Sequence, residues 1–304
     1  MTSAEMRGIF WFPQYKNRAG RYSVMNYSEL FQTIENGIRN VYDSSRYRRY
    51  LETMSHFHSY SLNNCLLIFE QKPEATLVAG YQTWRKEFGR HVKFGEKGIR
   101  ILAPVRSAKK EEPTEETDRP EELRFKSIAV FDISQTEGNP LPTYMNDTLY
   151  GTVKDYDAFL EQLKLISPVP VVFSDDTRGS HGFFRADTGV IAVRSGMPEL
   201  QTVKTLVHEI AHACLHNRAS GGNTLPKVQK EIEAESVAYI LCKHFGLDTG
   251  EYSFGYLAGY SSSRELPELR ASMERIRMTS DSLIRQIEFL RHPQTPEIVS
   301  AGTA

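Results

Sequence analysis

The stretch HEIAHACLH, from His208 to His216, constrains this sequence more than any other feature. His208 and His212 are four residues apart, so in a helix they share one face, with Cβ atoms about 5–6 Å apart. Two imidazoles at that separation can both reach one ion at the nitrogen–zinc distance of about 2.0–2.1 Å. Glu209 lies on the same turn and can reach a water on the ion without taking a ligand position. The spacing predicts a metal site with Glu209 as general base; the alternative is a chance match on an ordinary helix.

The surrounding residues favour the metal site over the chance match. VKTLVHEIAHACLH is mostly apolar, so we expect the helix to be buried on at least one side. A buried glutamate beside buried histidines is costly unless it is paired or lies beside a metal.

A third ligand lies downstream, in KEIEAESVAYILCKHF. Glu231 follows His212 after a gap of 18 residues, which leaves room for a loop and a second helix that returns alongside the first. We predict Glu231 as the third ligand of a site with one open position. Glu235 shares its face, and we expect it to accept the outward N–H of a ligand histidine. Glu233 points about 200° away and is expected to be solvated. The alternative is a plain acidic helix face.

Neighbouring residues refine this interpretation. His216 continues the histidine stripe but drifts about 80° from His208, so we expect it to make a structural hydrogen bond rather than to bind the metal. Metzincins place a third histidine six residues after the second and a glycine three residues after it. Those positions hold Arg218 and Leu215, which excludes that class. Tyr239 could stabilise an oxyanion, but a half-buried core tyrosine is the expected role.

Periodicity divides the rest of the chain into helices and strands. Apolar spacings of three and four predict helices at Tyr27–Tyr60, Val153–Leu165, Gln201–Asn217, Pro226–Phe245 and Glu265–Arg291. The helix that contains Glu231 is expected to end at Gly246. Runs rich in β-branched and aromatic residues predict strands at IRILAPV, FKSIAVFDI, PVVF, GFFRA and GVIAV.

Two segments interrupt this pattern. Ser107–Arg124 is acidic, contains prolines and lies between two predicted strands, so we expect a mobile loop that joins strands of one sheet. Thr136–Asp147 contains glycine and prolines and is predicted to be a linker. The sequence therefore predicts an α+β protein with one domain at residues 1–140, a second at 148–295 and a tail at 296–304.

Composition adds a charge asymmetry. The net charge is −1, yet residues 38–106 carry twelve Lys/Arg against six Asp/Glu, a local +6 that leaves about −7 elsewhere. A basic region favours a polyanion partner; a random excess of surface charge is the alternative. Three separated cysteines argue against a disulfide framework. No apolar run approaches the ~20 residues of a membrane span, and we see no signal peptide, so we expect a cytoplasmic protein with no membrane partner.

Two parts of the sequence resemble known families. HEIAHACLH with EIEAESVAY resembles the gluzincin-type site of the ImmA/IrrE and ArdC metallopeptidase-like families. The hairpin GFFRADTGVIAV is similar to the edge strand by which zincins hold a peptide. Ser61–Pro104 resembles the ArdC N-terminal domain, including its run WRKEFGRHVKFGEKG, and FDISQTEG matches the strand that closes that domain. The resemblance covers roughly Tyr27 to His244. It implies an antirestriction protein of a mobile element, with a domain that binds single-stranded DNA followed by a zincin-like domain.

The N-terminal residues are compatible with that implication. Single-strand binding needs cations for phosphates and aromatic faces for bases. We assign to it Trp84, Arg85, Lys86, Arg90, Lys93 and Lys97, which interleave with Tyr81, Phe88 and Phe94. Two alternatives are that the aromatic residues form a core beneath exposed cations, and that the basic region binds a protein. Gly89, Gly95 and Gly98 are expected to be turn residues with positive φ.

These features predict a zinc-dependent peptidase acting on a peptide or protein, with Mn²⁺ or another divalent metal as the alternative ion. Glu209 would take a proton from a water whose pKa the ion lowers towards about 7. The rival hypothesis is a non-catalytic protein that binds and protects DNA, with the zincin domain as a metal-bound scaffold.

Overall fold

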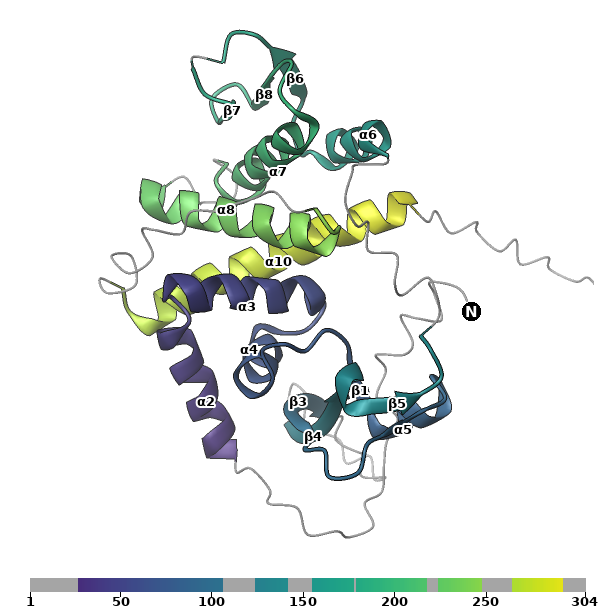
Figure 1. Cartoon of the computed structure of the whole chain (residues 1–304). Coiled ribbons are helices and arrows are strands. Elements are labelled where there is room, and N and C mark those ends of the chain that lie inside the picture. Colours follow the sequence, from purple (N-terminus) through teal and green to yellow (C-terminus); the bar gives the residue numbers. More distant parts are fainter. Residues whose placement is uncertain are drawn as a thin grey trace, which may run out of the picture. The chain divides into compact units, whose positions relative to one another are not determined.

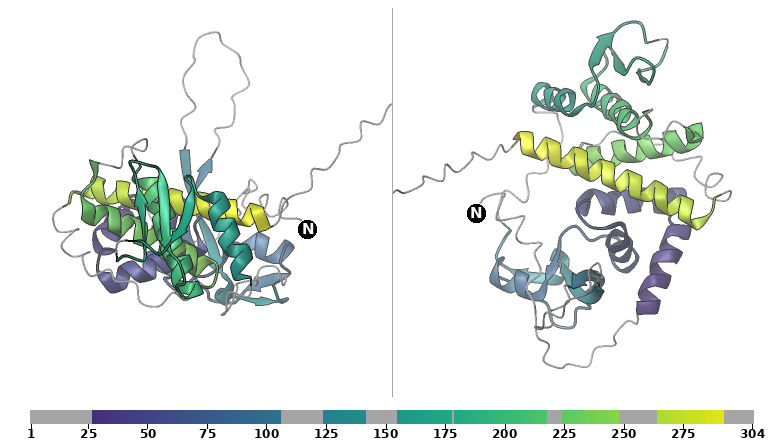
Figure 2. Two further views of the ribbon diagram at one scale, coloured as in Figure 1. Left: turned by 90° about the horizontal axis from the view of Figure 1, so that it is seen from above. Right: turned by 180° about the vertical axis from the view of Figure 1, so that it is seen from behind.

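The computed structural model describes residues 27–105, 124–141, 155–177, 179–217, 224–247 and 264–291. The chain divides into two compact units (Figures 1 and 2). The N-terminal unit comprises Phe12–Asn146 with Glu265–Leu269, and the C-terminal unit comprises Met1–Trp11, Asp147–Arg264 and Arg270–Ala304. Helices and strands are mixed in both units, which confirms the predicted α+β class. The predicted acidic loop (except Arg124), the tail and Arg218 lie outside the described residues.

The N-terminal unit begins with three helices. The segment predicted as one helical stretch forms α2 (Tyr27–Asn40) and α3 (Ser44–His56), followed by α4 (Leu62–Gln71). The break has a local cause, because the Asp43 carboxylate accepts hydrogen bonds from the backbone N–H groups of Ser45 and Arg46 and so caps a new helix start.

A three-stranded antiparallel sheet packs against α4. Its order is β1 (Val78–Gly80), β4 (Arg124–Asp132) and β3 (Ile99–Val105), so the two strands that flank the acidic segment pair directly, as predicted. The side-chain amides of Asn64 and Gln71 on α4 each bond both backbone groups of one residue on β3, Leu102 and Arg100, at 2.8–2.9 Å. The free edge of β3 is therefore satisfied by a helix rather than by another strand.

A second, two-stranded sheet pairs β2 (Arg90–Val92) with β5 (Thr136–Gly138); α5 (Tyr81–Lys86) precedes β2 and η1 (Ile133–Gln135) precedes β5. The first three residues of the predicted linker are therefore a strand. Gly89 and Gly95 have the predicted positive φ, 60° and 85°. Gly98 does not; it is needed for space, since a Cβ there would lie 2.8 Å from Cβ of Ala129.

The C-terminal unit is built around α7 (Glu199–Leu215). On one side lies the sheet β6 (Val171–Ser174), β8 (Val190–Arg194), β7 (Gly182–Arg185), with β8 central, parallel to β6 and antiparallel to β7. On the other side lies α8 (Lys227–His244), and α6 (Tyr156–Ile166) and α10 (Leu266–Arg291) complete the unit (Figures 1 and 2). Gly246, with φ +70°, ends α8 as predicted.

Burial in this unit is close to the expected pattern. Leu206, Ile210 and Ala211 of α7 are fully buried. Tyr239, predicted to be half-buried, is buried in the core. None of the helices within the described residues is long and apolar enough to cross a membrane.

Candidate metal centre

The histidines of HEIAHACLH and Glu231 converge from two helices. His208 and His212 lie on α7, and their Nε2 atoms are 3.0 Å apart. Glu231 lies on α8, and its Oε2 is 3.6 Å from Nε2 of His208 and 3.7 Å from Nε2 of His212. Ligands at about 2.0–2.1 Å from one tetrahedral ion are separated by roughly 3.3–3.4 Å. The triangle of 3.0, 3.6 and 3.7 Å brackets that value, so this donor set fits a single small divalent ion.

Glu235 reaches the outward side of His208. Its Oε2 lies 3.1 Å from Nδ1 of His208, the ring nitrogen that does not face Glu231. Because a carboxylate only accepts, Nδ1 carries the proton of this bond and Nε2 keeps its lone pair in the neutral ring. Lys204 lies 3.9 Å from the other oxygen of Glu235 and lowers the cost of this half-buried charge.

In the absence of a metal, the carboxylates act on the two histidines differently. Burial lowers the pKa of His208, but contacts with Glu231 and Glu235 outweigh burial and raise that pKa to about 9. Burial lowers the pKa of His212, and Glu231 only partly offsets it. The two imidazoles hold the pKa of Glu231 well below its ordinary value. A cation that binds here must displace the proton of His208.

Glu209 lies beside the ligands and against the sheet. It is 8% exposed, and burial raises its carboxyl pKa. The backbone N–H of Phe184, on β7, donates to its carboxylate. The helix can approach this strand closely because of Gly182, where a Cβ would lie 2.7 Å from Thr205 and 2.9 Å from the carbonyl of Ala192. A carboxyl group with a raised pKa is thereby held between α7 and the edge strand of the sheet.

Glu233 departs from its predicted place. It was expected to be solvated, but its side chain is fully buried and lies 3.2 Å from Nε2 of His216. Nδ1 of His216 is in turn 3.0 Å from Nδ1 of His212. The expected structural hydrogen bond of His216 therefore joins it to a predicted ligand. The helical wheel failed for Glu233 because it describes one helix, whereas α10 covers the side of α8 that we expected to face water.

The sequence did not reveal the hydrogen-bond donors that offset the free-energy cost of burying Glu233. Gln229 and Ser272 donate to Oε1 of Glu233 at 3.0 and 2.7 Å, and Arg275 donates to both oxygens. Burial by itself would raise the pKa of Glu233, but the bond with His216, together with those from Arg275, Gln229 and Ser272, outweighs burial and lowers that pKa. The i, i+4 spacing of Gln229 and Glu233 was readable, but Ser272 and Arg275 lie on α10, about 40 residues away in sequence.

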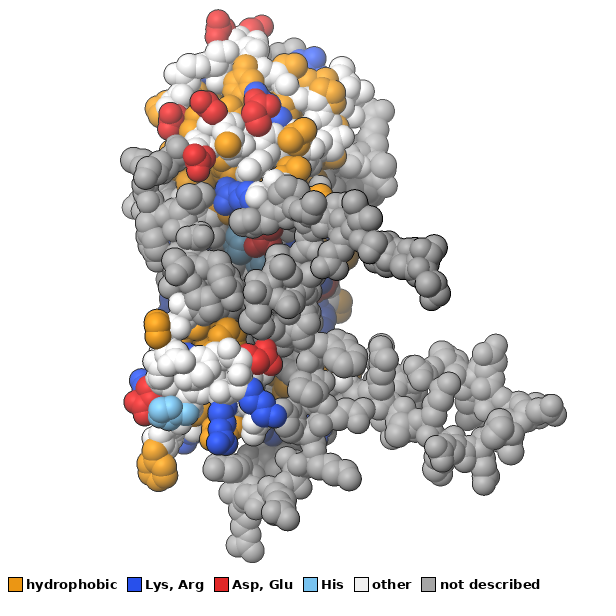
Figure 3. Space-filling view, turned by 90° about the vertical axis from the view of Figure 1, so that its right-hand side faces the viewer, with side chains coloured by type: hydrophobic (Ala, Val, Ile, Leu, Met, Phe, Trp, Pro, Cys, Tyr) orange, Lys and Arg blue, Asp and Glu red, His pale blue; other side chains and the backbone are white. Residues whose placement is uncertain are grey.

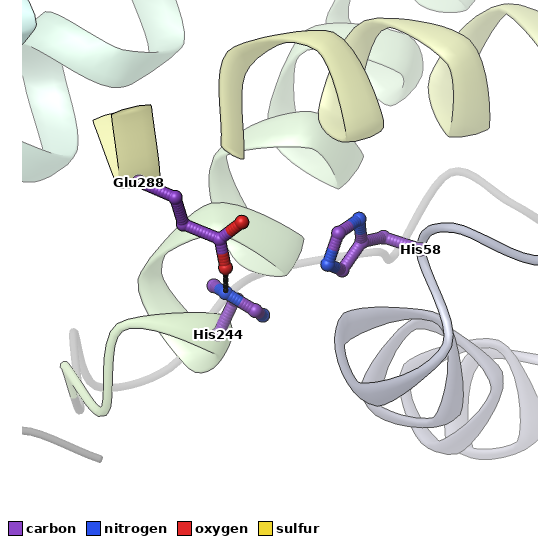
Figure 4. A group of neighbouring side chains, drawn as sticks. All are labelled: His58, His244 and Glu288. Carbon is purple, nitrogen blue, oxygen red and sulfur yellow. Dashed lines mark hydrogen bonds and ion pairs between the residues drawn. The ribbon is translucent and has the colours of Figure 1, made fainter. Parts of the chain in front are cut away.

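A second histidine–carboxylate pair lies elsewhere in the same unit. Nε2 of His244 is 3.1 Å from Oε1 of Glu288 (Figure 4). His58, which Figure 4 also draws, belongs to the N-terminal unit. Two donors within one unit fall short of the three protein ligands typical of a zinc site, so we assign no metal to this pair.

In the predicted DNA-binding set, Trp84 is misassigned, and Arg90 makes several bonds within the N-terminal unit. Trp84 is fully buried, and its indole N–H donates to the carbonyl of Phe131 at 2.8 Å, so its ring cannot stack on a base. The guanidinium of Arg90 binds Thr136 through Nε and Nη2, at 2.8 and 3.0 Å, and also donates to the carbonyl of Asn139. Arg90 therefore ties β2 to β5.

The remaining predicted residues are exposed. We call them, together with Phe94, the basic surface: Arg85, Lys86, Lys93, Phe94 and Lys97. Phe94 is fully exposed at the turn between β2 and β3. Figure 3 shows basic side chains and protruding hydrophobic side chains gathered over the region that Figure 1 labels α5 and β5.

Comparison with known proteins identifies both units. Residues 24–131 match the N-terminal domain of the anti-restriction factor ArdC. Residues 168–242 match the IrrE N-terminal-like domain of the M78 peptidase family. The chain is an ArdC-like two-domain protein. An uncharacterized protein from Bacillus anthracis is 29% identical to it over 276 residues, which are 77% of this chain and 46% of that protein. The ArdC-like chain thus spans about half the length of this curated relative.

Two solved structures are similar to this chain. Both are crystal structures of antirestriction protein ArdC from plasmid R388. The Mn(II)-bound form has a TM-score of 0.51 at 18% identity, covering 85% of this chain and 97% of the other. The metal-free form has a TM-score of 0.48 at 20% identity, covering 75% and 83%. The match to the Mn(II)-bound form shows that the ArdC-like chain has the same fold.

Proposed function

We propose that the ArdC-like protein is a metal-dependent hydrolase of peptide bonds that also binds single-stranded DNA through its N-terminal unit. The observation that carries the hydrolase is the placement of Glu209 next to a three-donor triangle of His208, His212 and Glu231. A bound divalent metal supplies polarisation of the substrate carbonyl and lowers the pKa of a water. The donor set suits Zn²⁺, and the Mn(II)-bound ArdC makes Mn²⁺ a second candidate.

Three features of the chain support a peptide as substrate. Strand β7 is an edge of its sheet, so one side of its backbone is available to an extended chain. The same strand holds Glu209 through the N–H of Phe184. Glu209 takes a proton from the attacking water, and its raised pKa brings it closer to the working pH of a general base. Glu231 is about half exposed, which leaves an approach for the substrate.

The test for hydrolysis is Glu209→Gln. The variant keeps the size of the side chain but loses the base, so it should bind metal normally while cleavage of dye-labelled casein falls by about 10²–10⁴-fold. Glu199→Gln, at an exposed position on the same helix, is the matched control and should cleave normally. If the metal-loaded wild type cleaves nothing and Glu209→Gln still protects incoming DNA in cells, the domain is a scaffold and the hydrolase proposal is wrong.

The basic surface supports the DNA-binding part of the proposal. Its lysines and arginine suit phosphates, and the fully exposed ring of Phe94 offers a face on which a base can stack. We expect binding of a single-stranded oligonucleotide to weaken with salt, with a log–log slope of about −0.7 per phosphate contact. Replacing Lys93 and Lys97 with glutamine should make that slope shallower, whereas Lys227→Gln, at an exposed lysine of the C-terminal unit, should not. If the wild type, the variant with both lysines replaced and Lys227→Gln gave equal slopes, the basic surface would not be the DNA-binding surface.

A further inference from the structure

The two predicted metal-binding histidines are supported in different ways. His208 meets the carboxylate of Glu235 directly. His212 meets another histidine, His216, and the carboxylate lies one step further away, at Glu233. Both chains end on the Nδ1 side of the ligand ring, opposite the Nε2 atoms that face Glu231.

The positions of the protons along the longer chain follow from what each atom can do. An ionised carboxylate only accepts, so the bond from His216 to Glu233 requires hydrogen on Nε2 of His216. A neutral ring with hydrogen on Nε2 has a bare Nδ1, which accepts from Nδ1–H of His212 at 3.0 Å. A neutral His212 with hydrogen on Nδ1 has its lone pair on Nε2, the atom that a metal needs.

The donors around Glu233 hold this order of protons in place. Gln229, Ser272 and Arg275 all donate to Oε1, and Arg275 also donates to Oε2, which leaves Oε2 to accept from His216. Glu233 is completely buried and His216 is nearly so, which shields the chain from water that could exchange protons with it. The guanidinium of Arg275, whose side chain is 34% exposed, balances the charge of the buried Glu233.

We propose that His216, Glu233 and Arg275 form a positioning relay that fixes His212 as the tautomer with its lone pair on Nε2. The relay rests on the proposed metal site. It extends that site to α10, because Arg275 and Ser272 lie outside the matched IrrE-like segment of residues 168–242. These residues act through His212 and touch neither the metal nor a substrate, so they are positioning residues. Outer partners of metal ligands typically contribute about 10–100-fold to metal affinity.

The decisive variant is Glu233→Gln. Three donors converge on Oε1, so the amide oxygen stays there and the amide NH₂ takes the place of Oε2, facing His216. The NH₂ group donates, which forces a bare Nε2 on His216, hydrogen on its Nδ1, and the opposite tautomer on His212. The substitution should therefore reverse the relay, and it also removes the bond that Nε of Arg275 donates to Oε2, whereas the three bonds to Oε1 are kept. Glu199→Gln on α7 is the matched control.

The test uses the full-length, metal-free protein. Side-chain ¹⁵N spectra of the histidines should show His212 protonated on Nδ1 in the wild type and in Glu199→Gln, and on Nε2 in Glu233→Gln. Competition with a fluorescent chelator should show about 10–100-fold weaker Zn²⁺ binding for Glu233→Gln, with retained helicity by circular dichroism.

Each outcome decides the matter. A wild-type His212 protonated on Nε2 would overturn the relay even if Glu233→Gln did not fold. An unchanged His212 tautomer and unchanged Zn²⁺ affinity in a folded Glu233→Gln would also overturn it. The tautomer is measured without metal and without turnover. A protein that binds no Zn²⁺, or that cleaves no peptide, would therefore contradict the proposed function, but the tautomer of His212 would still test the relay.

Discussion

Most charged side chains of the candidate metal centre are buried or half-buried and contact one another, whereas those of the basic surface are exposed. In the metal centre, Glu209 and the His216–Glu233 pair lie inside the protein, where each polar group needs a defined partner. On the basic surface, Lys86 and Lys97 are exposed to water, where the position of a charged side chain is only loosely fixed. In a buried polar site each residue therefore has a defined partner and position. In an exposed site only the general region of the surface is defined.

The largest effect should come from removing a histidine of the metal centre. His212→Ala deletes one of three donors and leaves His216 facing a gap, so the purified variant should retain less than about a third of the wild-type metal. Elemental analysis of protein purified without chelator measures this. Lys97→Ala, on the basic surface, should retain all of it. If the wild-type protein carries no transition metal, the candidate metal centre is not a metal site and the contrast with the basic surface fails.

Trp84 and Phe94 allow a buried and an exposed aromatic side chain of the N-terminal unit to be compared. Trp84 is fully buried, so Trp84→Ala should lower the unfolding free energy of this unit by about 3–5 kcal/mol. Phe94 is fully exposed, and Phe94→Ala should leave that free energy unchanged. Urea denaturation followed by circular dichroism compares them. Equal destabilisation by the two substitutions would show that Phe94 is covered in solution.

Phe94 should instead matter for the proposed nucleic-acid binding. Losing one stacked base weakens binding by about 1–3 kcal/mol, so we expect Phe94→Ala to lose roughly tenfold or more in affinity for a single-stranded oligonucleotide. Fluorescence anisotropy at fixed salt measures the change. Phe94→Trp should preserve binding, because any aromatic face can stack. Full affinity in Phe94→Ala would leave only the charges of the basic surface as contacts.

The smallest effect concerns pH. The pKa of Glu233 is lowered from 4.5 to about 2 in the folded protein, so the unfolded chain takes up a proton first as the pH falls. Its contribution to stability is complete above about pH 4.5 and is lost as the pH falls through the folded value. Between pH 6 and 3.5, the advantage of the wild type over Glu233→Gln should shrink by about 1 kcal/mol. Unfolding at both pH values tests this; a constant difference would mean that folding does not lower the pKa of Glu233.

The sequence by itself brought together the residues of the candidate metal centre because their key spacings are short. His208 and His212 are one helical turn apart, and so are Glu231 and Glu235, so helix geometry alone sets which side chains share a face. Helix and strand positions followed equally well where the apolar pattern was clear, as in α6, α7 and the pair β3–β4. The break between α2 and α3 did not, since a single capping residue, Asp43, interrupts a continuous apolar pattern.

Only the tertiary structure decided which polar residues are inside. Glu233 lies on the side of α8 that we expected to be solvated, and it is buried because α10 brings Ser272 and Arg275 to it from far along the chain. Trp84 and Phe94 are aromatic residues of one basic segment, yet one fills a core and the other is fully exposed. Burial depends on which distant element packs over a residue, and the local spacing of residues in the sequence does not show this. For this reason the helix motif predicted a site at His208, Glu209 and His212, while the contacts of His216 with His212 and Glu233 became visible only in three dimensions.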